Sequence, residues 1–219
     1  MPTRGTPQPI VRSADRRSFC GLGDSICVGN FSTALGGARY EVMIGLRSIL
    51  GYESKWVGSN TWNAFILPCI ATSGYTSAQL LTDVNTQSPS YTNTDFYMLM
   101  IGTNDMLSGV PTATTTGNID SICTRLRTDS PNSCIIVAYI IDNNGNTAAV
   151  DTLNAAIQTK MASRNDYAAS PAFGKTSTYD MKTQLGAYNA SFYSDSTHPN
   201  AAGYTRMANG WLSQIDIVI

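Results

Sequence analysis

Two almost continuous apolar runs constrain the fold of this chain more than any other feature of its sequence. They are DFYMLMIG at residues 95–102 and CIIVAYII at residues 134–141. Such runs are typical of strands that are buried on both faces, in a parallel sheet that helices cover on both sides. The other expected strands are 17–22, 55–58 and 175–181, and the expected helices are 37–51, 76–84, 118–127, 147–163 and 199–215. This alternation predicts an α/β fold with a mostly parallel sheet of about five strands.

The length of 219 residues favours one domain, since single hydrophobic cores grow to about 250 residues. We assign residues 18–219 to this domain. The first seventeen residues carry four Arg and one Asp and contain proline, so we interpret residues 1–17 as a flexible N-terminal tail. This tail lacks the apolar stretch of a signal peptide, and no run elsewhere is long enough for a membrane span.

Charge and cysteine content argue against several classes of function. The formal net charge is −1, whereas a nucleic-acid surface would be basic. The many Thr and Asn residues are a compositional hint of an extracellular or particle-associated protein. The five cysteines form no CxxC pair, so the sequence indicates no metal site. We expect them to be buried thiols, and a bridge between Cys123 and Cys134 stays open.

Three polar positions lie where ligands bind in α/β sheets, beyond the ends of expected strands. Ser25 in GLGDSICVG follows the first strand, and Asn104 and Asp105 in MIGTNDM follow the most apolar one. His198 lies in SDSTHPN, just before the last expected helix. Each position also has a structural interpretation. Ser25 could be a helix N-cap, Asn104 or Asp105 a turn cap, and His198 a loop residue ahead of a helix that begins at Pro199.

Nucleophilic catalysis would give these positions a common role. A serine hydroxyl becomes an effective nucleophile when a base takes its proton, and the usual base is an imidazole oriented by a carboxylate. His198 is the single histidine of the chain, and Asp195 precedes it by three residues. The reaction also needs donors for an oxyanion. The amide of Asn104 and the backbone at Gly74, in ATSGYTSAQ, offer such donors.

These blocks resemble the SGNH hydrolase superfamily, also called GDSL-type esterases and lipases. In chain order the blocks are GDS with Ser25, the glycine block with Gly74, GTND with Asn104, and DSTHP with Asp195 and His198. The similarity extends from residue 18 to about residue 215. It looks closest to acetyl xylan esterase and related carbohydrate esterases. One difference is TSGYT at the glycine block, where many such esterases have a histidine, and this leaves the subfamily open.

The resemblance implies a flavodoxin-like three-layer α/β/α fold and a serine esterase without a cofactor. It implies Ser25, His198 and Asp195 as catalytic residues, an oxyanion hole from the Ser25 and Gly74 backbone N–H groups and the Asn104 side chain, and Asp24 and Asp105 as supporting residues that brace the catalytic loops.

We therefore expect an esterase that removes acetyl or similarly short acyl groups from a carbohydrate. The alternatives are a lysophospholipase or acyl thioesterase, and a non-catalytic glycan-binding or virion surface protein on the same fold. A zinc-dependent deacetylase is hard to build with one histidine. The expected partners are small-molecule or glycan esters, and the oligomeric state stays open. Aromatic residues expected near the site, which could also simply pack its loops, are Trp62, Phe65, Tyr75, Tyr188, Phe192 and Tyr193.

Overall fold

The computed structural model describes residues 17–31, 37–49, 54–58 and 69–219. The tail assigned to residues 1–17 therefore lies outside the described residues, except for Arg17, which begins the first strand. Trp62 and Phe65 also lie outside them. The assignment of residues 18–219 to one domain stays a prediction.

Within the described residues, six strands form one sheet, and every pairing in it is parallel. The strands are β1 (Arg17–Gly23), β2 (Ser54–Trp56), β3 (Cys69–Ala71), β4 (Phe96–Met100), β5 (Cys134–Ala138) and β6 (Thr176–Tyr179). Their order is β2-β1-β4-β5-β6, and β3 pairs with β1 on the edge that β2 also uses. The sheet therefore has five strand positions, as predicted, and β3 is the strand that the sequence analysis missed.

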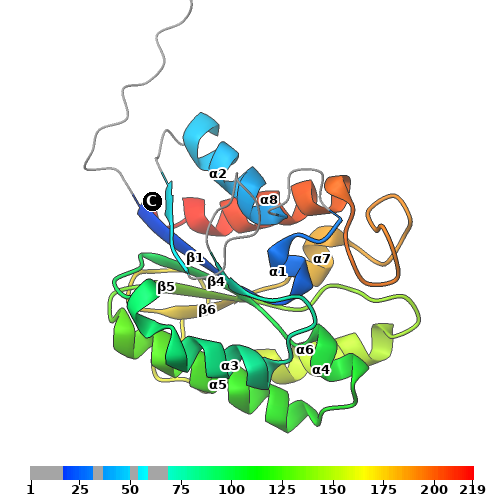
Figure 1. Ribbon diagram of the computed structural model, residues 1–219, viewed down its shortest axis with the longest axis horizontal. Helices are drawn as coiled ribbons and strands as arrows, with labels where there is room; N and C mark the ends of the chain where they lie inside the picture. The colour runs from blue at the N-terminus through cyan, green and yellow to red at the C-terminus, as the bar shows by residue number, and fades with distance from the viewer. Residues whose placement is uncertain (1–16, 32–36, 50–53, 59–68) are drawn as a thin grey trace, which may run out of the picture.

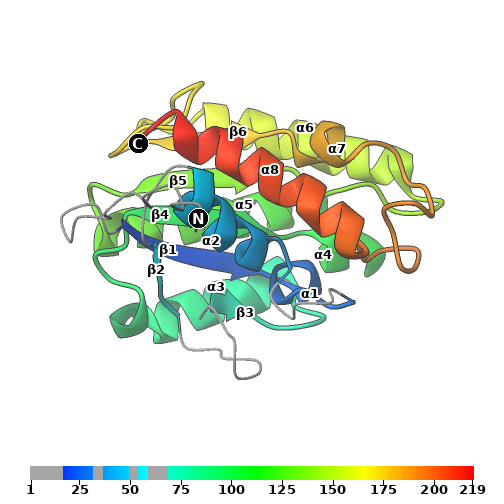
Figure 2. The same cartoon turned by 90° about the horizontal axis from the view of Figure 1, so that it is seen from above.

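Helices cover both faces of the sheet and give three layers (Figure 1). α2 (Ala38–Ile49) packs beside α8 (Ala201–Asp216) on one face, and Figure 2 shows both lying over the strands. α3 (Ser77–Thr86), α5 (Thr112–Asp129) and α6 (Thr147–Ala162) pack side by side on the other face. The shorter helices are α1 (Ser25–Val28), α4 (Thr103–Leu107), α7 (Met181–Leu185) and the 3-10 turn Ser88–Ser90. The predicted α/β/α architecture is confirmed.

The centre of the sheet is apolar on both faces. Every residue of β4 and β5 is buried, as the two apolar runs predicted. The cysteines are thiols, and the bridge between Cys123 and Cys134 does not form. Four of the five cysteines are buried, and Cys27 is half-buried. None of the described helices combines the length and the apolar character that crossing a membrane requires.

The register of three strands brings their carboxyl ends to one edge of the sheet. Gly23 at the end of β1 pairs with Ala71 at the end of β3 and, on its other side, with Met100 at the end of β4. The loops that follow these three residues therefore begin side by side, at the edge where ligands bind in α/β folds.

Candidate active site

Ser25 lies at the tight junction between β1 and α1. A Cβ atom on Gly23 would lie 2.4 Å from the carbonyl oxygen of Met100, so only glycine fits there. Asp24 is the N-cap of α1, and its carboxylate accepts a hydrogen bond from the N–H of Ile26 at 3.0 Å. Ser25 is the first helical residue, so the interpretation of this serine as an N-cap is wrong. Its hydroxyl points to a different partner.

Ser25, His198 and Asp195 form a continuous chain of hydrogen bonds. Oγ of Ser25 lies 2.9 Å from Nε2 of His198, and Nδ1 of the same ring lies 2.8 Å from Oδ2 of Asp195. When Nδ1 carries the ring proton and donates a hydrogen bond to the carboxylate, Nε2 keeps a lone pair that accepts a hydrogen bond from the serine hydroxyl. This geometry suits removal of the serine proton by a general base.

The carboxylate of Asp195 is held by its own loop. Its Oδ1 accepts hydrogen bonds from the backbone N–H groups of Thr197 and His198, each at 2.7 Å. Burial acts to raise the pKa of Asp195, but the hydrogen bonds from His198 and Thr197 outweigh it and hold the pKa below its ordinary value. An ionised Asp195 favours the ring tautomer in which Nδ1 is the donor.

The loop after β5 anchors the loop that carries His198, and sequence reasoning missed this contact. Nδ2 of Asn143 donates to Oγ1 of Thr197 at 2.9 Å. The N–H of Asn144 donates to the carbonyl of Ser196 at 3.0 Å. Two bonds thus fix the residues immediately before His198.

Asn104 lies in α4, where Gly102 occupies the N-cap position, so the side chain of Asn104 does not cap this helix. Instead its Nδ2 donates to the carbonyl of Tyr75 at 2.9 Å and ties α4 to the loop after β3. In that loop Gly74 has a φ of +83°, in the left-handed region that favours glycine. Among the described residues, the N–H groups of Gly74 and Ser25 have no hydrogen-bond acceptor. Both are therefore available to a ligand.

Asp105 is the buried brace beneath this loop. Its carboxylate accepts from the N–H and Oγ of Ser77 at 2.7 and 2.5 Å and from Oγ1 of Thr115 at 3.2 Å. These bonds join α4 to the start of α3 and to α5.

Asp24 is also buried, and burial raises its pKa to about 6 although the N–H of Ile26 acts to lower it. In the part of the chain that the structure describes, no three His, Cys, Asp or Glu side chains are grouped as metal ligands.

An exposed ring that the sequence analysis did not single out lies at the mouth of the site. Phe31 is 60% exposed, and its ring centroid lies 5.3 Å from that of His198. Its φ of +63° is uncommon for a bulky residue. Beside it, Oγ of Ser73 donates to Oδ1 of Asn30 at 3.3 Å. Phe31 thus stands next to a small polar rim.

The described aromatic residues that the sequence analysis did name, Tyr75, Tyr188, Phe192 and Tyr193, mostly pack the loops. Tyr193 is buried, and its ring centroid lies 4.8 Å from that of Tyr188. The guanidinium of Arg206 lies over the ring of Phe192, 4.3 Å from its centroid. Tyr75 is half-buried and contributes its carbonyl to the bond with the Asn104 amide. For these residues the packing interpretation is the better one.

Comparisons with known proteins identify the family. The model of the GDSL-like Lipase/Acylhydrolase family matches residues 22–206. A carbohydrate esterase family 3 structure from Talaromyces cellulolyticus is similar, with 21% identity, a TM-score of 0.74 and coverage of 92% of this chain and 97% of that chain. The family 3 carbohydrate esterase of Clostridium thermocellum is 22% identical, with a TM-score of 0.75 and coverage of 92% of this chain and 96% of that chain. An acetylxylan esterase from Geobacillus stearothermophilus is 16% identical, with a TM-score of 0.66 and coverage of 91% of this chain and 94% of that chain.

Comparison with curated protein sequences gives no match. At the identities above, the structural matches show a shared fold, whereas the family model covers most of the chain from β1 to α8. The chain belongs to the GDSL-like lipase/acylhydrolase family and is a carboxylic ester hydrolase of the SGNH type.

Proposed function

We propose that this protein is a serine esterase that removes acetyl or similarly short acyl groups from a carbohydrate through an acyl-enzyme. Ser25 is the nucleophile, His198 the general base and Asp195 the residue that orients the imidazole. The hydrogen-bonded chain from Ser25 Oγ through His198 to Asp195 carries this proposal. It places a proton acceptor within reach of a buried hydroxyl, which is what activation of a serine requires.

Acylation begins when Ser25 Oγ attacks the ester carbonyl carbon and His198 Nε2 takes the hydroxyl proton. The negative charge moves to the carbonyl oxygen, while Asp195 stabilises the imidazolium. The C–O bond to the sugar then breaks, and His198 gives its proton to the leaving oxygen. Water, activated by His198 in the same way, releases the acid and regenerates Ser25.

The oxyanion hole of this proposal consists of the N–H groups of Ser25 and Gly74 and the amide of Asn104. The register of β1, β3 and β4 supports it, because it starts the three loops side by side. Asn104 uses one amide hydrogen on the carbonyl of Tyr75. That bond orients the second hydrogen, which costs no reorganisation when the charge develops.

The substrate class rests on the mouth of the site. An exposed aromatic ring at Phe31 beside polar side chains at Asn30 and Ser73 suits the face and hydroxyl groups of a sugar. The similar structures of carbohydrate esterases and of an acetylxylan esterase point in the same direction.

A chain-length series tests the acyl group. Nitrophenyl acetate, butyrate and octanoate are compared with acetylated xylooligosaccharides, with Ser25→Ala as background. We expect the highest kcat/KM for the acetate and release of acetate from the oligosaccharides. A higher kcat/KM for the octanoate would favour a lysophospholipase or thioesterase. Failure of a serine-reactive organophosphonate to label Ser25 would favour the non-catalytic glycan-binding alternative.

A matched pair of variants tests the sugar contact. Phe31→Ala should raise KM for the acetylated oligosaccharide and change KM for nitrophenyl acetate much less. Phe173→Ala serves as the control, because Phe173 is also exposed, at 39%, but packs against Phe96 at the opposite end of β4. Equal effects of the two variants on the oligosaccharide would remove Phe31 from the proposal.

A further inference from the structure

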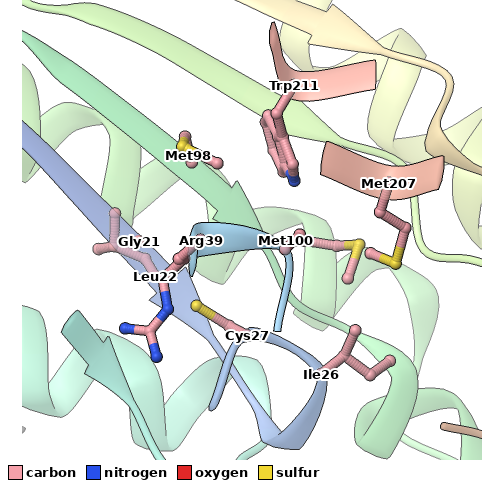
Figure 3. Close-up of a pocket in the computed structure, with 10 residues that line it drawn as sticks. Gly21, Leu22, Ile26, Cys27, Arg39, Met98, Met100, Met207 and Trp211 are labelled. Carbon is pink, nitrogen blue, oxygen red and sulfur yellow. The ribbon is translucent and has the colours of Figure 1, made fainter. Parts of the chain in front are cut away.

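Two cysteine side chains lie together beneath the nucleophile. Gly21 of β1 pairs in register with Cys69 of β3. A Cβ atom on Gly21 would lie 3.2 Å from Sγ of Cys27 and 2.7 Å from Cδ of Arg39. Cys27 therefore lies over the bare backbone of Gly21, next to Cys69, and the two thiols are hydrogen-bonded. Figure 3 shows Cys27 and Arg39 beside the part of β1 that carries Gly21.

The surroundings favour a thiolate at Cys69, whereas the hydrogen bond to Cys69 and burial raise the pKa of Cys27. Arg39 is buried, at 3% exposure, and hydrogen-bonds to Cys69. The hydrogen bond from Cys27 lowers the pKa of Cys69 and the charge of Arg39 adds to this, although burial acts in the opposite direction. By contrast, burial raises the pKa of Cys123 and of Cys134 to about 12. Thiolate character makes a cysteine reactive.

One member of the pair is within reach of a small molecule, because Cys69 is fully buried but Cys27 is not. Cys27 is half-buried. A cavity of about 20 Å³, lined by Cys27, Gly21 and Arg39, lies beside it. A cavity of this size holds roughly one water-sized molecule.

We infer that Cys27 and Cys69 form a dithiol that a hydroperoxide converts into a disulfide linking α1 to β3. The sulfur of Cys27, which lines the cavity, attacks a peroxide oxygen while the thiolate of Cys69 takes its proton, the O–O bond breaks, and the leaving oxygen takes a proton. The second thiol then attacks the resulting sulfenic acid, and the S–O bond breaks with release of water. In sum, two thiols are oxidised to one disulfide, and hydrogen peroxide is reduced to two molecules of water.

The link has a consequence for catalysis that rests on the proposed role of Ser25. Ser25 and Cys27 both belong to α1, which is only four residues long. An S–S bond of about 2.05 Å is shorter than a contact between two hydrogen-bonded thiols, so it pulls α1 toward β3. Ser25 Oγ then leaves its position 2.9 Å from Nε2 of His198. A displacement of about 1 Å at a reacting group costs on the order of 10²-fold in rate.

The experiment oxidises the full chain with hydrogen peroxide and follows two readouts. The first is the number of thiols titrated in denaturant after quenching, together with peptide mapping of the link by mass spectrometry. The second is the rate at which an organophosphonate labels Ser25. We expect the thiol count to fall by two from five, a Cys27–Cys69 peptide, and labelling at least ~10-fold slower, with recovery in dithiothreitol.

Variants assign the effect to this pair. Under peroxide, Cys27→Ala and Cys27→Ser should lose none of their remaining thiols and should keep their labelling rate. Cys123→Ala should lose two thiols and label more slowly, as the wild type does. Retention of all five thiols in the oxidised wild type would overturn the dithiol. A disulfide that leaves labelling unchanged would overturn its regulatory role. Absence of labelling before oxidation would count against the nucleophile instead, and the thiol count would still decide on the dithiol.

Discussion

His198 Nε2 lies 2.9 Å from Ser25 Oγ, although the two residues are 173 positions apart in the chain. Different hydrogen bonds hold the two residues in place. The cap at Asp24 fixes Ser25 at the start of α1, and Asn143 holds the loop of His198 through Thr197. Because the hydroxyl reacts only while the imidazole can take its proton, the two side chains should behave as one unit in kinetics.

Ser25→Ala and His198→Ala should each lower kcat by roughly 10⁴-fold or more, and the double variant should be scarcely worse than either single one. The reason is that either change alone removes the activated nucleophile. The measurement is kcat for nitrophenyl acetate, with the melting temperature as a control for folding. Multiplicative losses in the double variant would contradict a shared mechanism.

Asp195→Asn should reduce kcat by less than His198→Ala and by more than Asn104→Ala. The amide carbonyl can still accept the backbone N–H groups of Thr197 and His198, as Oδ1 does now. Its NH₂ group would then face Nδ1 and favour the tautomer with the proton on Nε2, which cannot accept from Ser25. A loss no larger than that of Asn104→Ala would leave Asp195 without an orienting role.

Asn104→Ala should lower kcat by about 10²-fold to 10³-fold with little change in KM, because an oxyanion donor acts mainly in the transition state. The variant also frees the carbonyl of Tyr75, so loosening of the loop needs a control. Gln79→Ala provides it, since Gln79 Oε1 accepts from the N–H of Thr76 at the other end of the same loop. A rise in KM with unchanged kcat would make Asn104 a substrate contact.

The long elements could be predicted because their apolar pattern extends over many residues. β4 and β5 are the clearest cases, since buried strands require apolar side chains on both faces. β3 has three residues and α1 has four, too few to show a period. α5 begins at Thr112 rather than at residue 118. The Thr-rich start of this helix has neither an apolar stripe nor high helix propensity, yet it buries Thr115 and Thr116.

Prediction of the candidate site depended on chemistry rather than on pattern. One histidine in the chain left a single candidate base for Ser25. Asn143 was missed, although it follows the strand predicted at 134–141 and the same strand-end rule applies to it. Phe31 gave no such signal, because its place beside His198 depends on a backbone turn with a φ of +63°.

Gly74→Ala should lower activity far more than stability. A Cβ atom at this position meets nothing within 4 Å, so the cost is the left-handed backbone alone, about 1 kcal/mol in free energy of unfolding. Relief of that strain turns the N–H away from the oxyanion. Gly174→Ala is the matched control, with a φ of +74°, equal space around it and a place just before β6, at the opposite edge of the sheet. Equal losses of kcat in both variants would exclude a role for the Gly74 N–H.

Asp24→Asn should stabilise the protein above neutral pH. Burial raises the pKa of Asp24 from 3.8 to about 6, so the folded state binds this proton more tightly than the unfolded state. Stability is therefore lost as pH rises between about pH 4 and pH 6, by up to roughly 3 kcal/mol. Asparagine avoids this loss, because it carries no charge and its carbonyl can still accept from the N–H of Ile26.

Urea unfolding of the wild type and of Asp24→Asn at pH 4 and pH 8 measures how the difference in free energy of unfolding changes with pH. The stability gained by the variant should be larger at pH 8, even though the loss of a charge beside the catalytic loop lowers kcat. Asp195→Asn is the control of opposite sign. The pKa of Asp195 is lowered by its hydrogen bonds to His198 and Thr197 against the effect of burial, so its carboxylate stabilises the fold above about pH 4 and that contribution fades below it. A gain for Asp24→Asn that is the same at both pH values would show that burial does not penalise the charge of Asp24.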